Sequence, residues 1–176
     1  MIVRLLLLLL LIPFWVYAQK KPVPIYKDPS KSVEGRVKDL LSRMTLQEKI
    51  AQMQEVPFLD LSDDSVTISR AKMEKRLEGL SYGCVKMRLL TSEQYAHAIT
   101  ALQKYMVEKT RLGIPILAPG ESLHGSIQDG STVYPQAIAL GSTFNASLVN
   151  MMTNTITREL KAQGITQVLS PDLDLA

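Results

Sequence analysis

The sequence predicts an α/β fold built on a parallel sheet. Two observations lead to this prediction. Short apolar runs, of a length and β-branched content that favour strands over helices, recur along the chain. Segments with apolar residues at helical spacing lie between these runs. The expected strands are 82–87, 114–118 and 165–169, and the expected helices between and before them are 71–78, 92–110 and 146–163. Such alternation is typical of parallel strands joined by right-handed crossovers.

The first 18 residues have the pattern of a signal peptide. Arg4 supplies a short positive region, residues 5–12 form an uninterrupted apolar core, and Val16 and Ala18 suit cleavage before Gln19. The apolar core is short for a membrane span, so an uncleaved anchor is only the alternative. We therefore expect a secreted or periplasmic protein that has no membrane contact once the leader is removed.

An extended linker is expected after the leader, over residues 19–31, because Pro22, Pro24 and Pro29 disfavour helix there. Residues 32–176 then make up the folded part.

Side chains that cap helices mark several helix starts. Ser32 is the expected N-cap of the first helix. Thr45 and Glu48 form a capping box for a short second helix, in which Ile50 and Met53 should be buried. Asn145 should cap the helix over 146–163; the same Asn begins a glycosylation sequon, but its role as a cap explains it without a sugar.

The composition excludes several classes of function. The formal net charge is +3 and no basic run is interleaved with aromatic residues, so no nucleic-acid partner is expected. The only cysteine, Cys84, lies in an apolar segment and reads as a structural thiol. With two histidines in the chain, of which His97 lies on a helix flank, no histidine-rich metal site is expected, and no cofactor. The aspartates at 60, 63 and 64 lack a fixed ligand spacing and suit a solvated loop better than a metal site.

The most informative stretch is 111–135. Its apolar run, residues 114–118, should be a buried strand, and Glu121 and His124 follow it between Gly120 and Gly125. Polar groups at the carboxyl end of a buried parallel strand are where α/β folds place their sites. Gly120 is expected to give the backbone the freedom to turn the Glu121 side chain inward. An ordinary solvated loop is the alternative.

Three blocks give this chain a resemblance to a known family. They are Glu121 with His124-Gly125 and Thr132-Val133-Tyr134-Pro135; residues 43–50, Arg-Met-Thr-Leu-Gln-Glu-Lys-Ile; and Val168-Leu169-Ser170-Pro171 with Asp174-Leu175-Ala176. In their order along the chain and in their spacing, the three blocks resemble the N-terminal barrel domain of glycoside hydrolase family 3, which contains exo-acting β-glucosidases and β-xylosidases. The resemblance covers roughly residues 26–176.

The resemblance implies a (β/α)8 barrel, of which this chain is an N-terminal portion that stops after about three strands. It also implies that Glu121 binds hydroxyl groups of the terminal sugar, and it marks His124 and Asp174 as candidate loop-organising residues. The nucleophile and the acid/base would both lie beyond Ala176, so that no catalytic residue and no metal ligand falls within this chain. The implied partner is an oligosaccharide or aryl β-glycoside.

The expected function is thus a secreted exo-β-glycosidase that acts with retention on terminal non-reducing β-linked sugars. The resemblance implies that the fragment alone is inactive. Family members more often have Asp where Glu121 stands, and Glu occurs in xylosidase-like members, so β-xylosidase or α-L-arabinofuranosidase activity is an alternative to β-glucosidase activity. A non-catalytic secreted carbohydrate-binding protein, or another hydrolase that uses Glu121 as its acid, are further alternatives.

Overall fold

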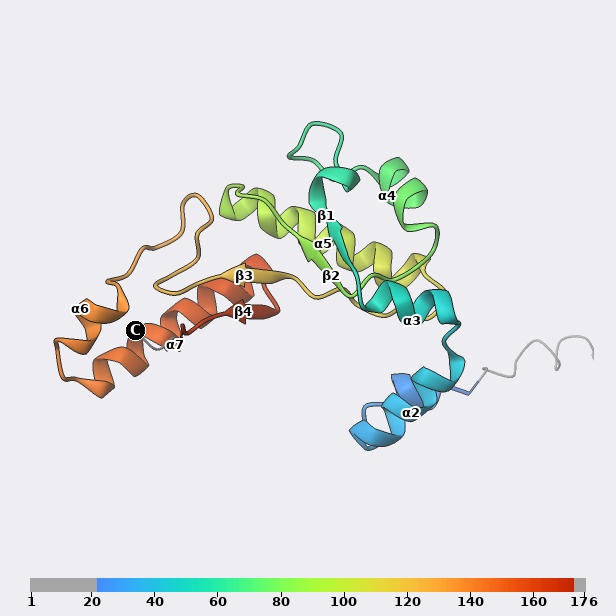
Figure 1. Ribbon diagram of the computed structural model, residues 1–176, viewed down its shortest axis with the longest axis horizontal. Coiled ribbons are helices and arrows are strands. Elements are labelled where there is room, and N and C mark those ends of the chain that lie inside the picture. Colours follow the sequence, from blue (N-terminus) through green and yellow to red (C-terminus); the bar gives the residue numbers. More distant parts are fainter. Residues whose placement is uncertain (1–21, 173–176) are drawn as a thin grey trace, which may run out of the picture. The chain divides into compact units, whose positions relative to one another are not determined.

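The computed structural model describes residues 22–172, and the chain divides into two compact units with a boundary between Arg43 and Met44 (Figure 1). The expected signal peptide and Asp174 lie outside the described residues. Among the helices that are described, none combines the length and the apolar character needed to cross a membrane.

The first unit holds a 3-10 helix, η1 (Ile25–Lys27), and the helix α2 (Val33–Arg43). The Tyr26 amide donates to Asp39 Oδ2 at 3.0 Å, and Arg36 Nε donates to the Tyr26 carbonyl at 3.1 Å. These bonds hold η1 against α2, so part of the expected extended linker is helical. Ser32 Oγ accepts a hydrogen bond from the Gly35 amide at 3.2 Å, as expected of the residue that caps α2.

The second unit alternates strands and helices. Its elements are, in chain order, α3 (Leu46–Gln52), β1 (Glu55–Pro57), the 3-10 helix η2 (Phe58–Leu61), α4 (Arg70–Leu77), β2 (Cys84–Lys86), α5 (Ser92–Lys109), β3 (Pro119–Glu121), α6 (Ala137–Gly141), α7 (Ala146–Gln163) and β4 (Gln167–Leu169). The α/β class expected from the sequence is confirmed.

Consecutive strands lie side by side and parallel. β1 pairs with β2, and β3 pairs with β4. A parallel bridge between Cys84 and Leu117 connects the two pairs, since Val85 N–H donates to the Leu117 carbonyl at 3.0 Å and Leu117 N–H donates to the Gly83 carbonyl at 2.9 Å. The order β1-β2-β3-β4 therefore follows the chain.

The sequence prediction missed β1. No strand was expected before residue 82, but Glu55–Pro57 pairs with Cys84–Lys86. The run 82–87 therefore contains the second strand and not the first. The strand escapes a pattern search because it is three residues long and contains Pro57, which cannot donate to a ladder. Within the described residues β1 pairs only with β2, and a proline is tolerated on such an edge strand.

The strand expected over 114–118 begins later than predicted. Pro115 has no amide hydrogen to offer. Both backbone polar groups of Ile116 are taken by Gln103 of α5: Ile116 N–H donates to Gln103 Oε1 at 3.1 Å, and Gln103 Nε2 donates to the Ile116 carbonyl at 2.6 Å. Strand pairing therefore starts only at Leu117, and Glu121 is the last residue of β3 instead of following the strand.

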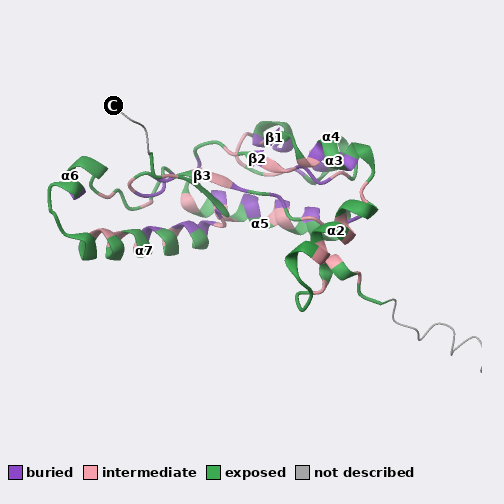
Figure 2. Cartoon of the chain, turned by 60° about the horizontal axis from the view of Figure 1, so that its bottom comes forward, coloured by how far each residue is buried: buried purple, intermediate pink, exposed green. Residues whose placement is uncertain are grey.

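The two faces of the strands have different neighbours. Val56, Val85 and Ala118 are completely buried on one face, in the cluster that also holds Tyr95 and Leu102 of α5. In Figure 2, α5 and α7 both run along this side of the strands. Because side chains alternate along a strand, Lys86, Leu117, Pro119 and Glu121 belong to the opposite face. The helices cover only one face within the described residues.

Apolar residues at helical spacing are not all buried. On α5, Ile99, Leu102 and Met106 are buried, but Val107 is exposed. On α3, Ile50 and Met53 were expected to be buried, and both are exposed. Helical spacing identifies the apolar side of a helix, but it does not show how far a neighbouring element covers that side.

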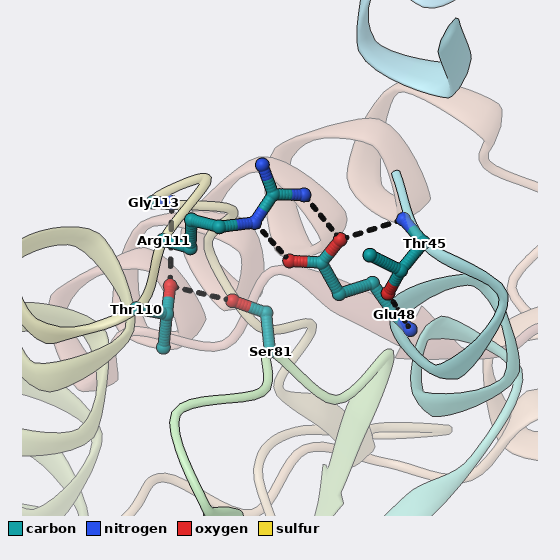
Figure 3. A network of polar contacts seen from close by, with 6 residues as sticks. All are labelled: Thr45, Glu48, Ser81, Thr110, Arg111 and Gly113. Carbon is teal, nitrogen blue, oxygen red and sulfur yellow. Dashed lines mark hydrogen bonds and ion pairs between the residues drawn. The ribbon is translucent and has the colours of Figure 1, made fainter. Parts of the chain in front are cut away.

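The capping box at Thr45 is present and has a further partner. The Glu48 amide donates to Thr45 Oγ1 at 3.2 Å, and the Thr45 amide donates to Glu48 Oε2 at 2.8 Å. Arg111, just after α5, also binds the Glu48 carboxylate (Figure 3).

A second set of hydrogen bonds lies beside the pair of Arg111 and Glu48. The hydroxyls of Ser81 and Thr110 lie 2.9 Å apart, and the Gly113 amide donates to Thr110 Oγ1 at 3.2 Å. The segment leading into β3 is thus anchored to α3.

Candidate functional site at the carboxyl ends of the strands

A hollow of about 440 Å³ opens at the carboxyl ends of β2, β3 and β4. Lys86 ends β2, Glu121 ends β3 and Leu169 ends β4, and all three residues line the hollow. Tyr95 of α5 and Gln128, from the loop after β3, complete two of its sides. The carboxyl ends of neighbouring parallel strands meet at one edge of a sheet, which is why side chains far apart in sequence lie together here.

Glu121 is exposed and stands opposite Leu169 in the parallel register of β3 and β4. Gly120, just before it, is needed for a different reason from the one expected. A Cβ atom at Gly120 would lie 2.8 Å from Ile165 Cδ1, and the φ angle of Gly120 is not among the positive ones. The glycine therefore provides room for the buried Ile165 side chain, and it does not provide unusual backbone freedom. This contact keeps β3 close to β4.

Four charged side chains line the hollow: Glu55, Lys86, Arg88 and Glu121. Within residues 22–172, none of them makes a salt bridge. The sequence prediction singled out only Glu121. Lys86 and Arg88 could have been found by the same reasoning, since they too follow the buried part of a parallel strand.

The sequence reasoning also missed the buried side chain that holds the loop after β3 in place. Gln163, at the end of α7, accepts a hydrogen bond from Ser126 Oγ at 2.7 Å and donates to Ser131 Oγ at 2.8 Å and Ser92 Oγ at 3.1 Å. It follows Ile156 and Leu160 on the buried side of α7. A polar residue that continues an apolar helix stripe was the signal that could have identified it.

The same loop is bound to the start of α5. Gln128 Oε1 accepts from the Leu90 amide at 2.9 Å, and the Asp129 carbonyl accepts from the Ser92 amide at 2.9 Å. Below the loop, the Tyr95 hydroxyl donates to the Pro119 carbonyl at 3.4 Å. Burial raises the pKa of Tyr95 to about 12, so this residue remains a neutral hydrogen-bond donor at physiological pH. The wall of the hollow is therefore well anchored.

His124 lies in this loop but is not one of the residues that line the hollow. Its carbonyl accepts a hydrogen bond from the Tyr134 amide at 2.8 Å. The next residue, Gly125, has a φ of +117°, and a Cβ atom there would lie 2.3 Å from the Thr132 carbonyl oxygen. The His-Gly pair thus joins the two ends of the loop through its main chain. Within the described residues, His124 Nδ1 is buried without a hydrogen-bond partner.

The aspartates of η2 and of the loop after it bind other groups of the protein. Asp60 pairs with Arg76 at 3.2 Å and Asp63 with Lys72 at 3.6 Å. Asp64 accepts hydrogen bonds from the amides of Thr67 and Val66, which lower the pKa of its carboxyl group. Across residues 22–172, no three His, Cys, Asp or Glu side chains are grouped so that they could hold a metal ion.

The other residues considered from the sequence, Cys84, His97 and Asn145, have structural surroundings. Cys84 is half-buried, and burial raises the pKa of its thiol, which makes it a weak nucleophile. The exposed His97 lies 3.6 Å from the Glu93 carboxylate on the same helix. Asn145 Oδ1 accepts from the Leu148 amide at 3.0 Å, so Asn145 caps α7.

Comparison with known proteins agrees with this arrangement. The glycosyl hydrolase family 3 N terminal domain matches residues 45–176. Beta-glucosidase C of Emericella nidulans is 30% identical over 168 residues, which are 90% of this chain and 27% of that protein. A beta-xylosidase of Formosa agariphila is 43% identical over 70 residues, which are 37% of this chain and 10% of that protein.

This chain is also similar to a solved structure. A β-glucosidase from Erythrobacter marinus superposes with a TM-score of 0.71 at 28% identity, over 88% of this chain and 20% of that one. The chain spans about a fifth to a quarter of the length of the first curated relatives that it matches. Because the family domain covers most of the described residues, including every strand, this chain belongs to glycosyl hydrolase family 3.

Proposed function

We propose that this chain forms the first part of the catalytic barrel of a secreted, exo-acting β-glycosidase. The enzyme would hydrolyse terminal non-reducing β-linked sugars with retention. One observation carries the proposal: in a family 3 chain, an exposed carboxylate, Glu121, ends a parallel strand at a hollow lined by the ends of three consecutive strands.

The strand arrangement supports a (β/α)8 barrel. Neighbouring parallel strands follow the chain order, and their helices lie on one face, as in the outer ring of such a barrel. Leu117 and Leu169, on the opposite face, are 48% and 47% exposed. Closure of the sheet would bury these apolar side chains inside the barrel.

Glu121 would hold the terminal sugar by accepting hydrogen bonds from its hydroxyl groups. Hydrogen bonds to a carboxylate are stronger than neutral ones, and no cation within residues 22–172 forms a salt bridge with this carboxylate. His124 would act through the loop, by joining its two ends at Tyr134.

The nucleophile and the acid/base would come from outside residues 1–176. A retaining glycosidase needs two carboxyl groups about 5 Å apart. The chain matches only about a fifth to a quarter of the length of its curated relatives, which leaves most of the enzyme to supply them. The relatives include both a β-glucosidase and a β-xylosidase, so a β-xylosidase is the second candidate.

Export is part of the proposal and rests on the pattern of residues 1–18 alone. Mass analysis of the protein recovered outside the cytoplasm should give a chain that begins at Gln19. Protein that retains Met1 would contradict cleavage of the leader.

The role of Glu121 is tested by replacing it in the full-length protein that contains this chain. Glu121→Ala should lower kcat/KM about 30- to 1000-fold on aryl β-glucoside or β-xyloside, the result of losing roughly 2–4 kcal/mol of charge-assisted hydrogen bonding. Added azide should not restore the rate, because no nucleophile has been removed.

Glu93→Ala is the matched control, since Glu93 is an exposed acid on α5 that does not line the hollow. It should leave kcat/KM unchanged. If Glu121→Ala melts at the parental temperature and also stays within about twofold of the parental kcat/KM on both substrates, Glu121 does not bind the sugar.

A further inference from the structure

Two cationic side chains, Lys86 and Arg88, stand beside Glu121 at the hollow. Lys86 is the last residue of β2, and Arg88 follows it two positions later. Both are exposed. Neither forms a salt bridge with any residue in the described part of the chain.

Some other cations of the described residues are paired. Four arginines elsewhere each bind a carboxylate at 2.5 to 3.2 Å, namely Arg43, Arg70, Arg76 and Arg111. Arg36 and Arg158 form no salt bridge in the described part of the chain, so it is the position of Lys86 and Arg88 at the hollow, and not the lack of a partner alone, that sets them apart. Lys86 and Arg88 instead place two like charges near each other at the edge of an open hollow, where they repel each other unless an anion enters.

The opposite charges of Glu121 and of the two cations determine which chemical group of a ligand each side chain can bind. Glu121 repels an anionic group, so it suits neutral hydroxyl groups. The guanidinium of Arg88 has a planar fork of donors that matches two oxygens of a carboxylate or sulfate, and the Lys86 ammonium adds a second charge. An anion bound by the cations therefore belongs to a different part of the saccharide from the hydroxyl groups held by Glu121.

We propose that Lys86 and Arg88 bind an anionic group on the sugar next to the terminal one. The natural substrate would then be an acidic oligosaccharide whose second residue carries a carboxylate or a sulfate ester. That the ligand is a glycoside rests on the proposed function, whereas binding of an anion at this edge rests on the two cations and the hollow.

The first test measures hydrolysis by the full-length protein. Three disaccharides share the terminal sugar and the linkage, and their second residue is glucose, glucuronate or glucose 6-sulfate. At least one acidic substrate should have a kcat/KM roughly tenfold above that of the neutral one. This ratio should fall as salt is raised, because counterions screen exposed charges. The better of the two acidic substrates identifies the anionic group.

The double variant Lys86→Gln/Arg88→Gln should bring the ratio of acidic to neutral kcat/KM close to one, because it removes the two charges that favour the acidic substrate. Lys49→Gln/Lys75→Gln removes the same charge from exposed sites on α3 and α4 and should leave the ratio unchanged. The proposal is overturned if the parent prefers the neutral substrate, or if the double variant keeps the acidic preference.

A binding measurement separates this inference from the proposed function. If no glycoside is hydrolysed, the proposed function fails, and the full-length protein is then titrated with D-glucuronate, glucose 6-sulfate and D-glucose by calorimetry. Tighter binding of an acidic sugar that is lost in Lys86→Gln/Arg88→Gln supports the inference by itself. Equal binding of all three sugars, or acidic binding that survives in the double variant, overturns it.

Discussion

The Arg111 guanidinium donates to both carboxylate oxygens of Glu48, at 2.9 and 2.5 Å, across 63 positions of the sequence (Figure 3). The side chain of Glu48 is only 10% exposed, and it also accepts the amide hydrogen of Thr45. One carboxylate thus completes the N-terminal cap of α3 and fixes the segment that leads into β3.

Removing this link should destabilise the protein in a pH-dependent way. Arg111→Met should lower the free energy of unfolding by about 1–3 kcal/mol at pH 7. The hydrogen bond from Arg111 is the main reason that the pKa of Glu48 lies below its ordinary value. A lowered pKa stabilises the fold above the unfolded value, about 4.3, and this contribution is lost as the pH falls through the folded value.

Urea unfolding of parent and variant at pH 7 and at about pH 3 measures this effect. The difference between the two proteins should shrink at the lower pH. Arg70→Met is the matched control, because it breaks an exposed ion pair with Glu74, and it should cost less than about 0.5 kcal/mol. A difference for Arg111→Met that is the same at both pH values would exclude the ion pair as its cause.

The close approach of β3 and β4 makes Gly120→Ala destabilising. The added methyl group would collide with Ile165, and overpacking of this kind costs about 1–3 kcal/mol. The double variant Gly120→Ala/Ile165→Val, which lacks the nearest atom, should recover part of that loss. Gly141→Ala, where the new Cβ meets nothing within 4 Å, should be neutral. If Gly120→Ala unfolds at the parental urea concentration, the contact with Ile165 does not require a glycine.

Gln163 should be essential for the order of the loop after β3. Gln163→Met keeps the length of the side chain but removes its hydrogen bonds to three serine hydroxyls, at a cost of about 1–3 kcal/mol. Hydrogen exchange should accelerate at the amides of residues 126–131. Asn154→Ala, which removes an exposed hydrogen bond to Asn150 on the same helix, should change neither quantity. Unchanged exchange in Gln163→Met would mean that other contacts hold the loop.

The chain without its leader, residues 19–176, should not hydrolyse aryl β-glucosides or β-xylosides. The carboxylates that line its hollow are Glu55 and Glu121, and we assign neither of them to catalysis. The measurement is release of the aryl group by the purified chain. If the purified chain is active and this activity is lost in both Glu55→Gln and Glu121→Gln, the catalytic pair lies in this hollow. If the activity survives Glu121→Gln, the role assigned to Glu121 is wrong.

The sequence by itself determined the features that depend on neighbouring residues. Thr45 and Glu48 form their capping box, and Asn145 caps α7, because a cap joins groups three residues apart in one turn of helix. The α/β class followed from the alternation of apolar runs with helical patterns. The position of Glu121 at a strand end also followed, to within the three residues by which the strand was misplaced.

Only the tertiary structure decided the features that join distant segments. Gln103 of α5 binds the backbone of Ile116 and delays the start of strand pairing, and β1 exists as a strand only because β2 lies beside it. The same holds for Ile165, which makes a glycine necessary at position 120, and for the gathering of Lys86, Arg88 and Glu121 at one hollow. Local patterns report the preferences of a segment, whereas hydrogen bonds and packing between segments depend on which residues the fold brings together.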